Sequence, residues 1–394
     1  MNTATTRGRD PASLRRDNLR ALLRHLHLHG PTSRAELCEI TGLTRSAIAG
    51  LVGELADRGL ALEGPTSQPP TGRGRPPIIV SPHEDQAYVL AVAVEVDTIR
   101  ISRVGFGGTV LAETRTAHDY APGDPQRSVQ QLTELLREWT HPSGTPPIGL
   151  GVAVPALVRA ADGRIMRAPN LGWQHLSLGD ELRRATGLPE PVVVGNEARL
   201  AALAEQRRGA GRECGDLVYV SADVGVGGGI LTRDQVLTGH TGYGGEIGHM
   251  ITNPGGRECH CGARGCWETE IGADALLRIS GAPAPQDRHA ALDDLLARAE
   301  RGDEDALTAF RELVRPVALG LVNLVNVFNP ERIILGGLLE PMLRHTGTQL
   351  ESALAGLRGL PEVPLDLRPA QLGDHAPLLG AAEAAVNHFL ARFE

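Results

Sequence analysis

Three of the five cysteines in this 394-residue chain lie on one short loop that contains glycine. They are Cys259, Cys261 and Cys266, and His249 precedes them on the same segment. Thiolate ligands favour zinc over hard cations such as Mg²⁺. Three cysteines and one histidine fill all four positions around a tetrahedral zinc ion, which is typical of a structural rather than a catalytic site. We therefore expect His249, Cys259, Cys261 and Cys266 to bind structural Zn²⁺.

The same segment permits other interpretations. His260 competes with His249 for the fourth position, but it lies between two of the ligands and is expected to point away from them. Without a metal, the cysteines would be unrelated reduced thiols, or Cys259 and Cys261 would form a disulfide. Five cysteines in a long chain do not indicate a disulfide framework, and they favour a reducing cytoplasm as the compartment.

Composition and charge limit the class of protein. Apolar residues make up 41% of the chain and aromatic residues only 3%, so the core must consist of Leu, Val, Ile and Ala. The length predicts two or three domains. The sequence contains neither an apolar run of about 18 residues nor a signal-peptide core, so we expect no membrane partner.

The charge is distributed unevenly along the chain. Net charge is −8, yet residues 1–80 contain 11 Arg against 7 acidic residues, and the remainder contains 28 Arg against 40 acidic residues. A basic N-terminal segment on an acidic body is typical of a DNA-binding module fused to another domain.

The basic segment has the pattern of three short helices. Leucines at helical spacing predict a first helix that ends at Gly30. Ser33 and Glu36 form a capping box at the start of the second helix, Gly42 ends it, and Thr44 caps the third. Two short helices joined by a turn with glycine are typical of a helix-turn-helix.

Residues 1–82 are therefore predicted to form a winged helix-turn-helix domain that binds a double-stranded DNA operator. Arg45 and Ser46 lie on the exposed first turn of the third helix, where base-edge contacts are made. Arg73 and Arg75 lie at the tip of the predicted wing, from which they can reach the minor groove or phosphates. The alternative is a three-helix interaction module with a solvated basic loop.

Residues 83–394 alternate between strands and helices, which predicts α/β architecture. Two such stretches each open with β-hairpins, so we expect two lobes with a ligand cleft between them. Residues 283–305 resemble a helical insertion, for which the sequence indicates no function.

The segment "GGEIGHMITNPGGRECHCGARGCWE" resembles the signature of the ROK family, which includes repressors and sugar kinases. Further similar motifs are "APNLGW", "GNEARLAALAE", "VSADVGVGGGILT" and "RIILGG", and together they cover roughly residues 87–390. The resemblance implies an actin-like ATPase (ribonuclease H-like) fold of two α/β lobes. The N-terminal domain is similar to that of the family's sugar-responsive repressors.

The resemblance also implies a set of sugar-binding residues. Carried over by motif, the side chains that bind sugar hydroxyls are Asn170, Asn196, Glu197, Glu246, His249 and Glu268. Carboxylates, amides and imidazole match hydroxyl groups that both donate and accept hydrogen bonds. For each single Glu or Asn, the alternative is a surface or capping role.

The motifs for ATP depart from those of the family's kinases. Glu95-Val96-Asp97-Thr98 stands where kinases have Asp-x-Gly-Gly-Thr, and both glycines are lost. Glu197 stands in place of the aspartate base, and its longer side chain would misplace the carboxylate. Val224 replaces a threonine in the second phosphate turn. We therefore expect no ATP cofactor and no catalytic residue.

These observations together predict a transcriptional regulator of repressor type, controlled by a sugar or a sugar phosphate. The resemblance implies a homodimer or homotetramer, since repressors of this type bind two half-sites. One alternative is an ATP-dependent sugar kinase with an appended DNA-binding domain. Another is a protein-interaction module that senses no ligand.

Overall fold

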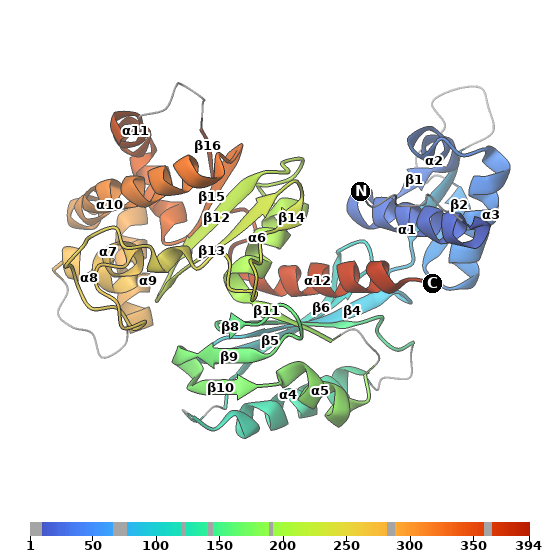
Figure 1. The fold of residues 1–394 in the computed structure, drawn as a ribbon, viewed down its shortest axis with the longest axis horizontal. Coiled ribbons are helices and arrows are strands. Elements are labelled where there is room, and N and C mark those ends of the chain that lie inside the picture. Colours follow the sequence, from blue (N-terminus) through green and yellow to red (C-terminus); the bar gives the residue numbers. More distant parts are fainter. Residues whose placement is uncertain are drawn as a thin grey trace, which may run out of the picture. The chain divides into compact units, whose positions relative to one another are not determined.

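The computed structural model describes residues 10–65, 77–119, 121, 123–140, 145–188, 192–281, 288–357 and 365–394. The chain divides into two compact units (Figure 1). The first unit contains residues 1–154, 163–195 and 381–394, and the second unit contains residues 155–162 and 196–380. In the described ranges, no helix has both the length and the apolarity needed to cross a membrane.

The N-terminal part of the first unit consists of three helices and a small antiparallel sheet. The helices are α1 (Pro11–His29), α2 (Arg34–Thr41) and α3 (Arg45–Asp57), and the sheet has the order β1 (Thr32–Ser33), β3 (Ile78–Pro82), β2 (Ala61–Pro65). The three helices share a core of fully buried aliphatic side chains: Leu19, Leu22, Leu23, Leu26, Leu37, Ile48, Leu51, Val52 and Leu55. These residues recur at helical spacing, which explains why the segment folds as amphipathic helices.

The predicted caps of the helix-turn-helix are confirmed. Ser33 Oγ accepts the N–H of Glu36, and the Glu36 carboxylate accepts the N–H of Ser33 in return. Gly42 ends α2 in the left-handed conformation with φ 69°, and the Thr44 hydroxyl accepts the N–H of Ala47 at 3.3 Å. The caps therefore fix where α2 ends and where α3 begins.

Each unit contains a mixed sheet of five strands. The sheet of the first unit has the order β11 (Val192–Asn196), β7 (Leu150–Val154), β4 (Tyr88–Val94), β5 (Thr98–Gly105), β6 (Val110–Ala117). The sheet of the second unit has the order β14 (Gln235–Val236), β13 (Val226–Thr232), β12 (Leu217–Ala222), β15 (Arg332–Gly337), β16 (Asp366–Pro369). In both sheets an antiparallel meander is extended by a parallel strand, β7 beside β4 and β15 beside β12.

Helices alternate with these strands, which confirms the α/β prediction. In the first unit they include α4 (Pro125–Thr140) and α5 (Leu178–Thr186). The second unit contains α6 (Glu197–Arg208), α7 (Trp267–Ile271), α8 (Ala273–Ile279), α9 (Arg288–Glu300), α10 (Glu304–Phe328) and α11 (Leu339–Leu357). The last helix, α12 (Ala376–Arg392), has its first residues in the second unit and the remainder in the first.

Short elements complete the fold. They are β8 (Leu157–Val158), β9 (Ile165–Ala168), β10 (Trp173–Leu176) and the 3-10 turns η1 (Pro169–Leu171), η2 (Ile247–His249) and η3 (Gly373–His375). β9 and β10 pair antiparallel. The predicted domain boundary at residue 82 falls at the end of β3 and stays a prediction.

Helix α6 packs unusually close to strand β13 because glycines face alanines there. A Cβ atom added at Gly227 would lie 2.6 Å from Ala198 Cβ, and one added at Gly229 would lie 2.4 Å from Ala202 Cβ. Neither glycine has a positive φ, so the reason for glycine here is close packing rather than turn geometry. This contact sets the position of α6, which Asn196 caps and Glu197 begins; both residues are predicted sugar ligands.

Candidate functional site

The side chains of His249, Cys259, Cys261 and Cys266 gather at one point in the second unit. Their ligand atoms all lie within 4.8 Å of one another. Cys259 Sγ lies 3.7 Å from His249 Nδ1, and Cys261 Sγ lies 3.6 Å from Cys266 Sγ. Around a tetrahedral zinc ion, with bonds of about 2.0–2.3 Å, neighbouring ligand atoms lie about 3.5–3.8 Å apart. The four groups could therefore bind a metal such as zinc.

The structure does not support His260 as the fourth ligand or a disulfide between Cys259 and Cys261. His260 is not part of the group of ligand atoms that the described residues form. Cys259 and Cys261 are both free thiols, which contradicts the alternative of a disulfide between them. Burial is the largest cause that raises the pKa of Cys259 to about 12. At neutral pH the metal-free thiol thus keeps its proton, which a bound metal would have to displace.

The loop that carries the cysteines is tightly turned. Cys259 N–H donates to the carbonyl of Ala263 at 2.8 Å, and Glu258 and Arg264 form an isolated bridge. Gly265 has φ 75°, and a Cβ atom there would lie 1.7 Å from the carbonyl oxygen of Asn253. Only glycine fits at this position, and it lets the chain return so that Cys266 meets Cys261.

Trp267 fastens the end of this loop to α10. Its side chain is fully buried, and its Nε1–H donates to the carbonyl of Pro316 at 2.9 Å. The indole ring lies against Gly320, where an added Cβ atom would lie 2.0 Å from the ring. The missing side chain at Gly320 thus creates the space for Trp267, and Trp267 in turn places its neighbours Cys266 and Glu268.

Glu268 lies between the cysteine cluster and the glycine-rich turn before β13. One carboxylate oxygen accepts the N–H of Val226 at 3.1 Å, and the other lies 3.5 Å from Cys259 Sγ. Gly225 leaves room for this carboxylate, since a Cβ atom there would lie 2.9 Å from it. The partner Val226 was missed in the sequence, because no local pattern pairs residues so far apart.

Glu246 lies within electrostatic reach of His249, Arg199 and Glu268. Burial raises the pKa of Glu246, the charges of His249 and Arg199 oppose that rise, and Glu268 adds to it. Arg199 donates to the carbonyl of Gly242 at 2.6 Å, and burial lowers the pKa of its guanidinium. Sequence reasoning missed Arg199. A signal was available, because Arg199 lies in the first turn of α6, three residues after the capping residue Asn196.

Asn196 fills the capping role that was the alternative interpretation of this residue. Its side-chain oxygen accepts the N–H of Arg199 at 3.0 Å, and its amide donates to the carbonyl of Ala156 at 3.1 Å. The oxygen retains a second lone pair, so capping leaves room for a bond to a ligand. Glu197 follows as the first residue of α6 and is half-buried.

Asn170 belongs to a different unit from the other predicted sugar ligands. It belongs to η1 in the first unit, where its side chain is exposed. The other predicted sugar ligands, Asn196, Glu197, Glu246, His249 and Glu268, all belong to the second unit. The sugar-binding role of all six residues stays a prediction.

The turn between β4 and β5 is a tight hairpin. Glu95 N–H donates to the carbonyl of Thr98 at 2.8 Å, and neither Val96 nor Asp97 has a positive φ. The Glu95 carboxylate accepts the Thr98 hydroxyl at 2.6 Å and pairs with the buried Arg100. The Thr98 hydroxyl and the Arg100 guanidinium thus bind a carboxylate of the chain itself, in the turn where the sequence departs from the kinase motif.

The predicted DNA contacts are only partly described by the structure. Arg45 and Ser46 are exposed on the first turn of α3, and the Ser46 hydroxyl lies 3.1 Å from that of Thr44. Arg73 and Arg75 lie outside the described residues. The exposed first turn of α3 is the surface from which this motif is expected to contact bases.

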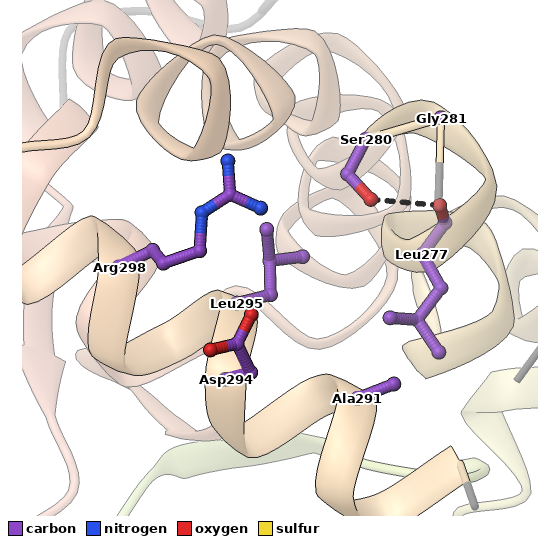
Figure 2. Close-up of a pocket in the computed structure, with 7 residues that line it drawn as sticks. All are labelled: Leu277, Ser280, Gly281, Ala291, Asp294, Leu295 and Arg298. Carbon is purple, nitrogen blue, oxygen red and sulfur yellow. Dashed lines mark hydrogen bonds between the residues drawn. The ribbon is translucent and has the colours of Figure 1, made fainter. Parts of the chain in front are cut away.

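Two of the cavities that the described residues form lie in the second unit. The larger, of about 370 Å³, is formed by α8, α9 and the residues that follow α8 (Figure 2). Two of its polar side chains are engaged, since Arg298 donates to Asp303 and the Ser280 hydroxyl donates to the carbonyl of Leu277. No predicted sugar ligand lines it. The smaller, of about 260 Å³, is lined by Glu246 and by apolar side chains of α10.

An N-terminal helix-turn-helix, two five-stranded α/β sheets and a Cys3His loop define a class of protein that joins a helix-turn-helix to a two-sheet α/β body. The chain belongs to the ROK family, whose model matches residues 96–387. The helix-turn-helix lies before the matched residues.

Relatives with known names fall into two groups. The xylose repressor of Bacillus subtilis (strain 168) is 28% identical over 388 residues, which cover 97% of this chain and 98% of the repressor. A crystal structure of a ROK family transcriptional regulator, a homolog of the E. coli MLC protein, has a TM-score of 0.78 at 26% identity and covers 96% of this chain and 98% of its own. The ROK family glucokinase from Streptomyces griseus, in complex with glucose and AMPPNP, has a TM-score of 0.67 at 28% identity, over 76% of this chain and 99% of its own.

Gly320→Ala tests the anchoring of the loop. A methyl group at residue 320 would overlap the Trp267 ring, so we expect a loss of about 1–3 kcal/mol in the free energy of unfolding, measured in urea. Gly347→Ala is the matched control, because the nearest atom to its added Cβ is 3.8 Å away. Equal stability of the two variants would contradict the role given to Gly320.

Cys266→Ser tests the metal cluster. The protein purified from cells should retain a single zinc ion per chain after dialysis, and the variant should lose it because one of four ligands is gone. Zinc is measured by elemental analysis. Cys38→Ser, on α2, should keep its zinc. Zinc retained in full by Cys266→Ser would show that these thiols do not hold the metal.

Proposed function

We propose that this protein is a DNA-binding transcriptional regulator of repressor type that controls carbohydrate genes in response to a sugar or a sugar phosphate. One observation carries the proposal: the similarity to a xylose repressor extends over 97% of the chain and includes the N-terminal helices. The glucokinase covers only 76% of the chain. The cytoplasm follows as the compartment in which such a protein would reach DNA.

The N-terminal domain would bind an operator. Arg45 and Ser46 on α3 would contact base edges, and Arg73 and Arg75 would contact the minor groove or phosphates. Regulators of this kind read two half-sites, so a homodimer or homotetramer would be the binding species.

The body would bind the effector through Asn170, Asn196, Glu197, Glu246, His249 and Glu268. Of these, His249 and Glu268 both lie within electrostatic reach of Glu246. A zinc ion held by His249, Cys259, Cys261 and Cys266 would be structural, since protein ligands fill all its positions. Sugar affinity would depend on the loop because His249 and Glu268 stand at its two ends.

ATP chemistry would play no part in this function. The β4–β5 turn binds the carboxylate of Glu95, and the glycines of β13 serve its contact with α6. Because the chain also resembles ROK glucokinases, an ATP-dependent sugar kinase with an appended DNA-binding domain is the second candidate. A kinase would form ADP from ATP and sugar, whereas a regulator would not, so ADP formation distinguishes the two functions.

The proposed function predicts DNA binding that a sugar changes, without turnover. Genomic fragments retained by the full-length protein supply the operator, and fluorescence anisotropy then measures its Kd with xylose, glucose, N-acetylglucosamine or mannose present. We expect one sugar to change the operator Kd and the Kd to rise steeply with salt. ADP formation from Mg-ATP and the same sugars should stay at background. Robust ADP formation would favour the kinase, and absence of specific DNA binding would overturn the regulator.

Glu246→Gln tests the effector site. Because a charged carboxylate makes stronger hydrogen bonds to sugar hydroxyls than an amide does, Glu246→Gln should weaken sugar affinity about ten- to hundred-fold, measured by calorimetry. Glu258→Gln lies on the same loop with an exposed side chain that pairs only loosely with Arg264, and it should leave sugar affinity unchanged. Unchanged affinity in Glu246→Gln would remove this residue from the site.

A further inference from the structure

The C-terminal part of α12 holds the DNA-binding helices within the first unit; Figure 1 draws α12 in red, leading to the C-terminus. Arg20 of α1 donates from Nε to the carbonyl of Phe393 at 2.9 Å. Arg58, which caps the C-terminal end of α3, donates to the carbonyl of Glu394 and places its guanidinium 4.9 Å from the centre of the Phe393 ring. Both helices of the domain that border α12 are thus bonded to the last residues of the chain.

The most buried polar contact in this region joins His27 of α1 to Glu383 of α12. The two residues are 2% and 3% exposed, and His27 Nε2 lies 2.8 Å from Glu383 Oε2. The other ring nitrogen of His27 contacts the carbonyl oxygen of Phe106, which follows β5. A pair of polar side chains this deeply buried has to keep its partners, because water cannot replace them.

The chemistry of the His27 contacts makes them specific. A carbonyl oxygen can only accept, and so can an ionised carboxylate, whereas a neutral imidazole has a single N–H. Each ring nitrogen of His27 faces its own oxygen partner, one on Glu383 and one on Phe106, so the two contacts together hold the ring in one orientation. Such a contact fixes both the distance and the angle of α1 against α12, which apolar packing alone would leave adjustable.

The start of α12 is fastened to α6 within the second unit. A Cβ atom at Gly380 would lie 1.9 Å from the carbonyl oxygen of Leu200, so the two helices touch backbone to backbone. At the other end of α6, the buried carboxylate of Glu205 accepts the N–H groups of Gln371 and Leu372 at 2.9 and 2.8 Å. One contact joins α6 to α12 itself and the other joins α6 to the segment that leads into α12; Asn196 caps α6 and Glu197 begins it.

From these contacts we propose that the buried His27–Glu383 pair is the positioning contact through which α12 makes operator affinity depend on the state of α6. The inference rests on the proposed function and adds the route of coupling. Sugar binding at the first turn of α6 biases the position of α12, and the pair passes that bias to α1 and α3. Coupling between two sites requires an element that both of them bias. Helix α12 meets this requirement, because its first part contacts α6 and its last part, with the residues after it, contacts α1 and α3.

The test compares Glu383→Ala with wild type and with Glu351→Gln, an exposed position on α11. For each full-length protein, the operator Kd is measured with and without the effective sugar, and the sugar Kd is measured alone. We expect Glu383→Ala to keep its sugar Kd within about twofold, while the sugar-induced change in operator Kd falls at least about fivefold toward none. Glu351→Gln should match wild type in both quantities.

Two further variants keep the proposal falsifiable. Glu383→Gln retains a side chain that can donate to a neutral His27 ring, so it should restore most of the sugar response. Where Glu383→Ala does not fold, as judged by near-ultraviolet circular dichroism and zinc content, His27→Gln replaces it, because one amide nitrogen cannot occupy both positions of the ring nitrogens.

The outcomes separate the two levels of the account. A wild-type protein whose operator affinity ignores every sugar overturns the proposed function and the inference with it. A wild-type protein that responds, together with a folded Glu383→Ala or His27→Gln variant that responds equally, overturns the inference alone. Loss of sugar affinity in either variant would also overturn it, since the pair would then act on the sugar site itself.

Discussion

The segment from His249 to Glu268 is the constraint on which the candidate site depends. Two predicted sugar ligands stand at its ends, and little regular structure holds the residues between them. Four ligand-type side chains within 4.8 Å of one another close the loop, and Trp267 fastens its end to α10 through the space left by Gly320. A metal at the cluster would therefore act on sugar affinity by fixing the distance between His249 and Glu268, without contacting the sugar.

Close packing at glycine is the second theme of the structure. Gly227 and Gly229 bring α6 onto β13, and Gly380 brings α12 onto α6. In a kinase the glycines of this strand and turn would be explained by phosphate. Here the Val226 N–H donates to the Glu268 carboxylate, and the Thr98 hydroxyl of the β4–β5 turn donates to the Glu95 carboxylate. The glycines of β13 thus support packing, while the turns of the body bind internal carboxylates.

The sequence predicted those features whose causes are local. The capping box of Ser33 and Glu36, the Thr44 cap and the gathering of cysteines follow from spacing within a few residues. Arg199, Val226 and the His27–Glu383 pair could not be predicted in this way, because their partners lie on other elements and are chosen by tertiary packing. The short β4–β5 turn was recognised as a departure from kinases, but its internal ion pair with Arg100 becomes evident only when both strands are placed.

Reciprocity of binding tests the central claim most directly, namely that one chain links sugar binding to DNA binding. The operator Kd is measured with saturating sugar and without it, and the sugar Kd is measured with saturating operator and without it. Linkage requires that the two ratios be equal, and the account predicts equal ratios that differ clearly from one. A ratio of one in both experiments, with both ligands bound, would contradict it.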